Sequence, residues 1–233
     1  MFKGGQPVDG FVGALPEAEL RAFLDKHVPS AADMDAGEDV QEAGDLLAVG
    51  DTESATLRLQ EAVAVNPGND AARFDYLRAL LGAGRIAEAR RAFDPVASKV
   101  MLDARLAACG HWLSACEGAA SRPSVEALSA AVAANKRDFD ARFALAQTHL
   151  AAQDFTAAMD ELLEIVMRDK SWRDELARKT YVAILELMNK PAPAARAEAE
   201  RPKGALELSG KPAATASDPV VDAYRRKLSM ALF

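Results

Sequence analysis

The sequence predicts a mostly α-helical protein, an α-solenoid of repeated helix pairs that is preceded by a short segment of strand and helix. Two observations carry this prediction. The chain matches itself at offsets of 34 and 69 residues, and the repeated region has apolar residues at helical spacing. Half of the 233 residues are hydrophobic, so the chain can bury a sizeable core.

The opening stretch GGQPVDGFVGALPEAELRAFLDKHV, residues 4–28, has the pattern of a strand followed by a helix. Residues 7–12 alternate like a short strand, and residues 15–28 have helical spacing. One strand and one helix cannot bury themselves. We therefore expect residues 1–13 to be poorly ordered or to lie against another surface, and residues 16–27 to keep a helix by packing on the first repeat.

The repeat is marked by turn glycines and small residues at fixed positions. A shift of 34 places Gly50 on Gly84, and a shift of 69 places Gly84 on Gln153. The same shifts superimpose Ala55 on Ala89, Ala89 on Ala158, and the triplet Ala72-Arg73-Phe74 on Ala141-Arg142-Phe143. This pattern resembles the tetratricopeptide repeat, in which small residues let paired helices approach closely and a turn glycine reverses the chain.

Four such units fit the repeat region 36–188. They are residues 36–69, 70–103, 104–138 and 139–171, and a helix from Trp172 to Met188 would cap them. The third unit is the weakest, because its first helix has no clear register and residues 118–123 look like a longer turn. The alternative is a non-repetitive, alanine-rich helical bundle, and the two matching offsets argue against it.

In such a superhelix the first helix of each pair lines the concave side, so its exposed residues decide what binds. Six apolar residues hold equivalent positions there and form the predicted client-binding groove: Val40, Leu47, Phe74, Leu81, Phe143 and Leu150. An apolar groove would suit non-native chains or a hydrophobic partner helix. For the leucines, packing of helix on helix is an equal alternative. Replacing Phe74 and Phe143 with serine should weaken capture of unfolded protein more than it lowers helicity.

Composition and motifs argue against several classes of function. The net charge of −7 repels phosphate backbones and anionic lipid, and no window is long and apolar enough to span a bilayer. Phosphate-binding, serine hydrolase and zinc protease motifs are missing, and the acidic pairs Asp160-Glu161 and Asp174-Glu175 look like solvated helix faces. We therefore expect no enzyme activity, no cofactor, no nucleic-acid or membrane partner, and a cytoplasmic location.

The cysteines and histidines predict neither a disulfide nor a metal site. Cys109 and Cys116 lie seven residues apart in one helical pattern, about 10 Å, which is beyond disulfide reach. We expect both to be ordinary buried thiols. His27, His111 and His149 lie on separate elements without a partner at ligand spacing.

The composition changes after Met188. Residues 189–217 are rich in Pro, Ala, Lys and Glu, which predicts a mobile linker. Residues 218–233 then predict an amphipathic helix with Asp218 as its N-cap. Its apolar residues follow a spacing of three to four: Val221, Tyr224, Leu228 and Leu232. This helix could dock on the chain's own last repeat, on another protein, or on both.

Together these parts resemble the chaperedoxins, bacterial proteins that join an N-terminal thioredoxin-like domain to tetratricopeptide repeats. The opening FKGGQPVDGFVGALPEAELRAFLDKH is similar to the final hairpin and last helix of that domain, with Phe2, Val8 and Phe11 on strands and Gly13 at the turn. The stretches SWRDELARKTYVAILELM and DPVVDAYRRKLSMALF are similar to the family's closing segment. On this resemblance, residues 1–30 are the C-terminal remnant of a thioredoxin-like α/β domain in an N-terminally truncated chain.

The resemblance implies a cytoplasmic co-chaperone that holds unfolding proteins under stress and passes these clients to the chaperonin GroEL or to the DnaK system. The C-terminal helix would contact the chaperonin, through Tyr224, Arg225, Arg226, Leu228, Leu232 and Phe233. Two alternatives remain open. One is a repeat scaffold that binds a single defined protein partner. The other is a thioredoxin-type oxidoreductase, which requires a domain upstream of Met1 to carry the redox motif.

Overall fold

The computed structural model describes residues 2–3, 6–7, 10, 16–27, 31–189 and 218–232. The chain forms two compact units, Met1–Ala79 and Leu80–Phe233, and the boundary falls within helix α4, Asp70–Gly82. The predicted linker lies outside the described residues except for Asn189, as do Val8, Phe11 and Gly13 of the predicted hairpin and Phe233 of the tail.

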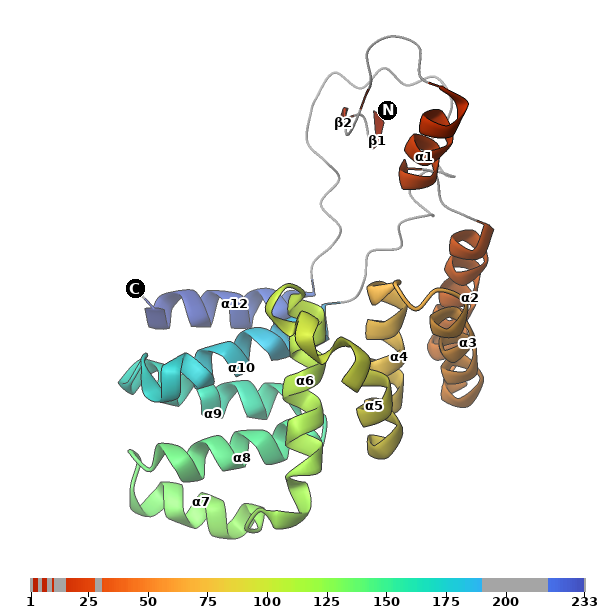
Figure 1. The fold of residues 1–233 in the computed structure, drawn as a ribbon. Coiled ribbons are helices and arrows are strands. Elements are labelled where there is room, and N and C mark those ends of the chain that lie inside the picture. The colour runs from red at the N-terminus through yellow and green to blue at the C-terminus, as the bar shows by residue number, and fades with distance from the viewer. Residues whose placement is uncertain are drawn as a thin grey trace. The chain divides into compact units, whose positions relative to one another are not determined.

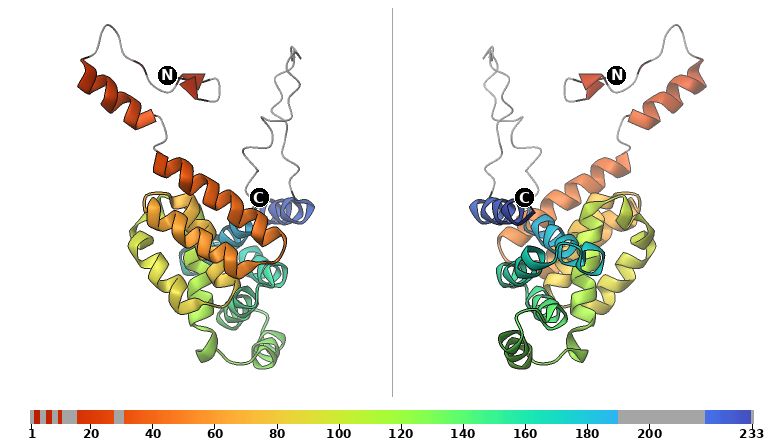
Figure 2. Two further views of the ribbon diagram at one scale, coloured as in Figure 1. Left: turned by 90° about the vertical axis from the view of Figure 1, so that its right-hand side faces the viewer. Right: turned by 90° about the vertical axis from the view of Figure 1, so that its left-hand side faces the viewer.

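The first unit begins with a two-stranded hairpin and continues in helices. Strands β1, Phe2–Lys3, and β2, Gln6–Pro7, pair antiparallel. Helix α1, Glu17–His27, covers the segment predicted to be helical after the strand. Helices α2, Ala31–Ala48, and α3, Thr52–Val65, lie side by side as the first predicted pair (Figure 2).

The second unit holds the remaining helix pairs. Its elements are α5, Ile86–Phe93; the 3₁₀ helix η1, Asp94–Met101; α6, Ala104–Glu117; the 3₁₀ helix η2, Ala119–Ser121; α7, Val125–Ala134; α8, Phe139–Ala151; α9, Phe155–Arg168; α10, Trp172–Met188; and α12, Pro219–Leu232. Helices α7, α8, α9 and α10 each pack on the next, α12 packs on both α9 and α10, and α6 contacts α8 and α10 (Figure 1). The weak third unit also holds two helices, α6 and α7, and the longer turn between them contains η2, but α6 packs on α8 and α10 and α7 packs on α8 rather than on each other.

Helix α10 has the bounds predicted for the capping helix, but its first turn is irregular. Arg173, Asp174 and Glu175 have φ values of 46°, 54° and 62°, so the regular right-handed helix begins after them. The Arg173 guanidinium, in turn, pairs with Asp140 of α8 at 2.8 Å and lies over the Trp172 ring. These contacts hold the irregular turn against the fourth repeat.

Three turns between paired helices have the same backbone geometry. Gly50, Gly84 and Gln153 have φ values of 85°, 71° and 64°, the left-handed region. In each turn this residue donates its N–H to the carbonyl three residues back, and the next residue donates five residues back, which is the Schellman motif. The predicted superposition of Gly84 on Gln153 is therefore confirmed in the backbone. A glutamine takes the glycine conformation there, and its Nε2 donates to the Gly82 carbonyl at 3.1 Å.

Small residues allow the paired helices to approach. Ala55, Ala89 and Ala158, the alanines that superimpose in the sequence, are all fully buried. The turns that follow α3 and α7 also have the same side-chain hydrogen bond. Asn66 and Asn135 lie 69 residues apart, and each side-chain oxygen accepts the N–H of the residue two positions on, at 3.1 and 3.0 Å. The sequence repeat therefore corresponds to repeated helices, repeated turns and repeated side-chain caps in the structure.

The left-handed turn gives a prediction for stability. Gly84→Ala should lower the free energy of unfolding of the second unit by about 1 kcal/mol, because a side chain in the left-handed region costs about 1–2 kcal/mol. Gly82→Ala is the matched control, since the nearest atoms to its new methyl group lie 3.8 and 4.0 Å away and its φ is not positive. Urea unfolding followed by circular dichroism measures both. Equal losses would contradict the prediction.

Candidate functional site

Helix α12 docks on α9 and α10 of the same chain. Val221, Tyr224 and Leu228, which share one face at a spacing of three and four residues, are buried. Asp218 begins the helix, because its side chain accepts the Val220 N–H at 2.8 Å. The self-docking alternative is therefore confirmed, and three of the four apolar residues predicted for this helix are buried.

A single carboxylate holds the docked helix at its centre. Asp160 of α9 accepts hydrogen bonds from the Tyr224 hydroxyl and from Lys227 Nζ, both at 3.1 Å. The Tyr181 hydroxyl of α10 donates to the Tyr224 carbonyl at 2.8 Å. Near the end of α12, Lys170 Nζ donates to the Leu232 carbonyl at 2.6 Å. Polar contacts thus accompany the apolar face along the helix.

The prediction that the acidic pairs are solvated faces holds for Asp160, whose side chain is 55 % exposed, and is wrong for Glu161, whose side chain is 25 % exposed. Both carboxylates have partners. Asp160 binds α12, and Glu161 forms an ion pair with the buried Arg142 of α8. Adjacent residues on a helix point in different directions, so one carboxylate reaches α12 while the other reaches α8. In the second pair, Glu175 forms an ion pair with Arg178.

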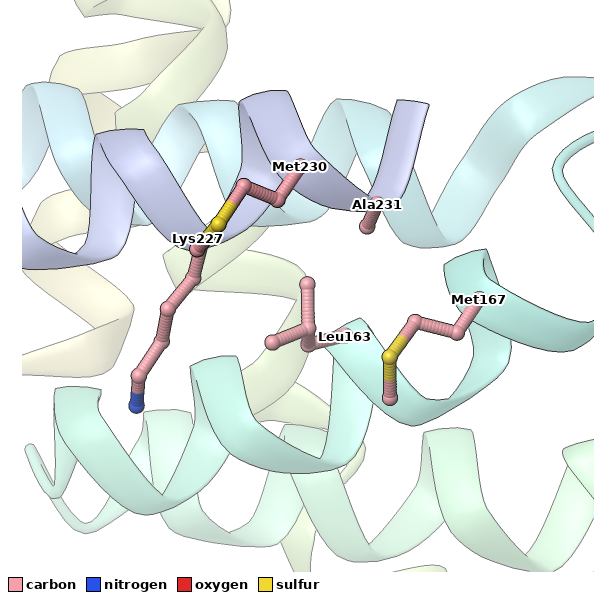
Figure 3. A pocket seen from close by; sticks show the side chains of 5 residues that line it. All are labelled: Leu163, Met167, Lys227, Met230 and Ala231. Atoms are coloured by element: carbon pink, nitrogen blue, oxygen red, sulfur yellow. The ribbon is translucent and has the colours of Figure 1, made fainter. Parts of the chain in front are cut away.

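Beside this contact, α9 and α12 form an open, mostly apolar pocket of about 530 Å³ (Figure 3). Two lining residues come from α9 and three from α12: Leu163, Met167, Lys227, Met230 and Ala231. The Met167 and Met230 residues are 50 % and 74 % exposed. Figure 3 shows Leu163 lying between the two methionine side chains. The pocket therefore presents flexible thioether groups to solvent.

The predicted groove residues lie mostly elsewhere. Phe74, Leu81, Phe143 and Leu150 are at most 7 % exposed. The exposure expected of Phe74 and Phe143 is wrong, and for Leu81 and Leu150 the alternative of packing between helices is confirmed. The Phe143 ring, for example, packs on Trp172 with centroids 5.2 Å apart. Leu47 is 41 % exposed and Val40 is half-buried. Within each unit, therefore, most of these side chains belong to the core and not to an open surface.

The predicted partner-binding residues of the tail divide between two faces of α12. Tyr224 and Leu228 face α9 and α10, whereas Arg225 and Arg226 are exposed and Leu232 is half-buried. Sequence reasoning missed Leu163, Met167 and Met230. The spacing of four between Leu163 and Met167 places them on one face of α9, but only the docked position of α12 reveals their partner.

Tyr224 and Lys227 have pKa values shifted by this contact. Burial, followed by the hydrogen bond to Asp160, raises the pKa of Tyr224 above its ordinary value of 10.0. The hydrogen bond to Asp160 raises the pKa of Lys227 above 10.5. Burial likewise raises the pKa of Tyr181. The protonated forms of all three groups are therefore favoured when α12 is docked.

These shifts predict how docking depends on pH. A raised pKa contributes stability below the ordinary value, and this contribution disappears as the pH rises through the raised value. We expect α12 to remain docked below about pH 10 and to separate from α9 as the pH rises through the raised pKa values of Tyr224 and Lys227. Near-ultraviolet circular dichroism of Tyr181 and Tyr224 measures the change. A signal that is constant through the ionisation of Tyr224 would contradict this prediction.

The described residues offer little for metal or thiol chemistry. Within them, no cluster of three or more His, Cys, Asp or Glu side chains is placed to hold a metal ion. Cys109 and Cys116 are both free thiols, the first buried and the second half-buried. His111 shares a hydrogen bond with Thr180 at 3.2 Å, and burial followed by the charge of Lys179 lowers its pKa. Its side chain thus joins α6 to α10.

None of the helices in the described part of the chain has the length and apolar character needed to cross a membrane.

Comparison with known families supports the helix-pair architecture. One tetratricopeptide-repeat model matches residues 46–108, and a second matches residues 118–201. A comparison with curated proteins gives no match. The two matched ranges include helices from each of the four units predicted from the sequence. Repeats of this kind present surfaces to other proteins. The chain therefore contains tetratricopeptide repeats, and repeats of this kind indicate a protein-binding scaffold.

Proposed function

We propose that this protein is a cytoplasmic, non-enzymatic co-chaperone that holds non-native proteins under stress and passes them to the chaperonin GroEL or to the DnaK system. The observation that carries the proposal is the methionine-lined pocket between α9 and α12. The resemblance of both ends of the chain to the chaperedoxins supports the same function.

The chemistry of the pocket suits clients of varied sequence. Methionine has three rotatable bonds and a polarisable sulfur, so its side chain adapts to apolar groups of different shape. Met167 and Met230 flank Leu163, and the remaining lining consists of Ala231 and the stem of Lys227. Such a lining supplies apolar contact with few directional bonds. It therefore favours unfolded segments over one defined structure.

Further apolar side chains are open to solvent on each unit. Met101, the last residue of η1, and Leu102, which follows it, are almost fully exposed in the second unit. In the first unit, Leu47 and Val49 are exposed at the turn between α2 and α3. A long unfolded chain gains affinity by contacting several weak sites at once. These residues add sites of that kind.

One observation favours the alternative of a scaffold for a single partner. The face of α9 and α10 already binds one helix, α12, by a defined set of contacts to Asp160 and Tyr181. A face that recognises one amphipathic helix in this way has the character of a specific helix-binding groove. The test of function must therefore separate general capture of unfolded chains from binding of one partner.

An aggregation assay makes that separation. The full chain should suppress light scattering from a heat-unfolded client protein, and the double variant Met167→Ser, Met230→Ser should suppress it less. Val182→Ser is the matched control, because Val182 is similarly exposed on α10 but does not line the pocket. A client that precipitates equally fast with and without the wild-type chain would reject the holdase proposal in favour of the scaffold.

Transfer to the chaperonin is tested separately. Arg225 and Arg226 are the exposed cationic residues among those of α12 that remain open to a partner while the helix is docked. Reversing both charges, Arg225→Glu with Arg226→Glu, should lower recovery of GroEL in a pull-down, and removal of residues 218–233 should abolish it. Equal recovery from all three chains would remove the tail from the transfer step.

A further inference from the structure

We infer that the exposed face of helix α3 binds a basic amphipathic helix of a partner protein. This face lies in the first unit and shares no residue with the pocket between α9 and α12, so the inference goes beyond the proposed function. Four residues of α3 form the face, which we call the acidic ridge: Glu53, Leu57, Glu61 and Val65.

The acidic ridge is a helix face that no described element covers. Its four residues follow one another at a spacing of four, so they form a single row along the helix, and all four are exposed. Leu57 is 54 % exposed and Val65 is 49 % exposed. The packed face of α3 holds Ala55, Leu59 and Ala62, which are buried. Two large apolar side chains are therefore open to solvent on one face of α3.

The helix pair α2 and α3 carries the negative charge of the whole chain. Residues 31–65 contain nine aspartate and glutamate residues and one basic residue, Arg58, so this stretch has a charge of −8, against −7 for the full chain. The Arg58 guanidinium pairs with Asp39 and Glu42 of α2 and with Glu61 of the ridge. One positive charge cannot neutralise three carboxylates, so the surface remains negative when all of these ion pairs are counted.

The neighbouring helix α4 does not supply the missing positive charge. Its Arg78 pairs with Asp75 of the same helix. Its Arg73 is buried and donates to the Pro67 carbonyl at 3.2 Å. Both guanidinium groups are therefore engaged by α4 and by the turn that precedes it, and a partner must bring the positive charge.

Repulsion within α2 also favours a cationic partner. Glu38, Glu42 and Asp45 are exposed and lie three and four residues apart, so they are neighbours on one face of the helix. Like charges at this spacing destabilise a helix, and a bound cation relieves the repulsion. Glu42 is also joined to Glu61 of the ridge through Arg58. The charge of α2 therefore acts on the same surface as the charge of α3.

The order of residues along the ridge specifies the partner. Leu57 lies between two carboxylates, those of Glu53 and Glu61, each about 6 Å away along the helix axis. A complementary helix has a large apolar residue with Lys or Arg four positions before and after it, and a second apolar residue opposite Val65. Nucleic acid and anionic lipid have the wrong charge for this surface, and a second copy would place its own negative hairpin against it. A basic amphipathic helix of another protein has both the charge and the spacing that the ridge requires.

The experiment uses the full chain and a fluorescently labelled synthetic helix in which Lys and Leu alternate at every fourth position. Leu57→Ser should weaken binding about tenfold, because the variant loses the burial of a leucine side chain. Val182→Ser is the matched control, since Val182 is 43 % exposed on α10 of the second unit. The affinity of this control, measured by fluorescence anisotropy, should equal that of the wild type. Circular dichroism verifies that both variants keep their helices.

The charge of the ridge is tested by Glu53→Lys, with Glu126→Lys as its control. Glu53 and Glu126 are each the second residue of a helix, α3 and α7, and both are exposed, so the two substitutions have the same effect on net charge and on the helix dipole. Only Glu53→Lys should weaken binding, by at least about fivefold. Binding to the wild-type chain should also weaken as salt is added, because salt screens exposed charges.

An analogue of the probe with Glu in place of Lys should not bind. The inference is overturned if the wild-type chain does not bind the basic probe, if the acidic analogue binds as tightly, or if Leu57→Ser and Glu53→Lys bind like their controls. Self-association of the wild-type chain in sedimentation velocity that Leu57→Ser abolishes would assign the face to a second copy and would also overturn it. The aggregation assay with Met167→Ser, Met230→Ser tests the pocket independently of all these results.

Discussion

Replacing Glu161 with alanine is expected to lower the free energy of unfolding of the second unit by about 3 kcal/mol, because the buried guanidinium of Arg142 loses its carboxylate partner. The Arg142 side chain is 8 % exposed and lies on α8, and Glu161 reaches it from α9. The Nε atom of Arg142 is buried without a hydrogen-bond partner within the described residues. The remaining charge would therefore be poorly compensated. Because Glu161 is itself 25 % exposed, water can replace part of what is lost, which places the effect at the lower end of the range.

The neighbouring carboxylate provides the control. Asp160→Ala removes an exposed ion pair and should cost at most about 1 kcal/mol of global stability, while loosening α12. The double variant Arg142→Met, Glu161→Leu should recover most of the loss, since an apolar pair of similar volume leaves no charge unpaired. Urea unfolding of the four chains, followed by circular dichroism, compares them. A Glu161→Ala chain as stable as the Asp160→Ala chain would show that Arg142 does not depend on its partner.

The helix pairs and their turns could be predicted from the sequence because their determinants are local. A turn glycine such as Gly84 specifies a backbone conformation that few other residues adopt, and a shift of 69 identifies Gln153 as its counterpart. Buried alanines such as Ala89 and Ala158 identify the helix faces that approach each other. The capping residues follow the same period. Each of these signals lies within one turn of the structure that it specifies.

The exposure of side chains on the repeats could not be predicted in the same way. The match between the repeats shows that Phe74 and Phe143 hold corresponding positions. It does not show which face of each helix is covered by the next helix. Phe143 is covered by Trp172, in the irregular first turn of α10, where no repeat pattern applies. Leu47 and Leu150 are also equivalent, yet Leu47 is exposed and Leu150 is buried. Position in a repeat therefore does not determine burial.

The pocket could not be predicted from the sequence, because it is formed by two helices that lie far apart along the chain. The spacing in the tail predicted an amphipathic helix, and its buried residues Val221, Tyr224 and Leu228 agree with that pattern. The same pattern allowed docking on this chain or on another protein. Only the observed contact with α9 brings Met230 beside Met167. Long-range pairing of this kind leaves no periodic signal in the sequence of either helix.

Replacing Phe143 with alanine is expected to destabilise the second unit by about 3–5 kcal/mol, the range for a buried phenylalanine that is reduced to a methyl group. The ring is 7 % exposed and packs on Trp172 at an interplanar angle of 54°. Its removal leaves a cavity between α8 and α10 and also removes an aromatic contact. Phe143→Ser should cost at least as much, because its hydroxyl would enter an apolar space.

This expectation opposes the interpretation of Phe143 as a client-binding residue, under which the serine variant would lose binding and keep its helicity. Leu47→Ser is the control, since Leu47 lies at the surface and such substitutions usually change stability by no more than about 0.5 kcal/mol. Thermal unfolding by circular dichroism, run beside the aggregation assay, decides between the two. If Phe143→Ser kept the wild-type melting temperature and lost client capture, the residue would have to be open to clients in solution. If it melts earlier while Met230→Ser melts normally and holds less client, client binding belongs to the α9 and α12 pocket and Phe143 belongs to the core.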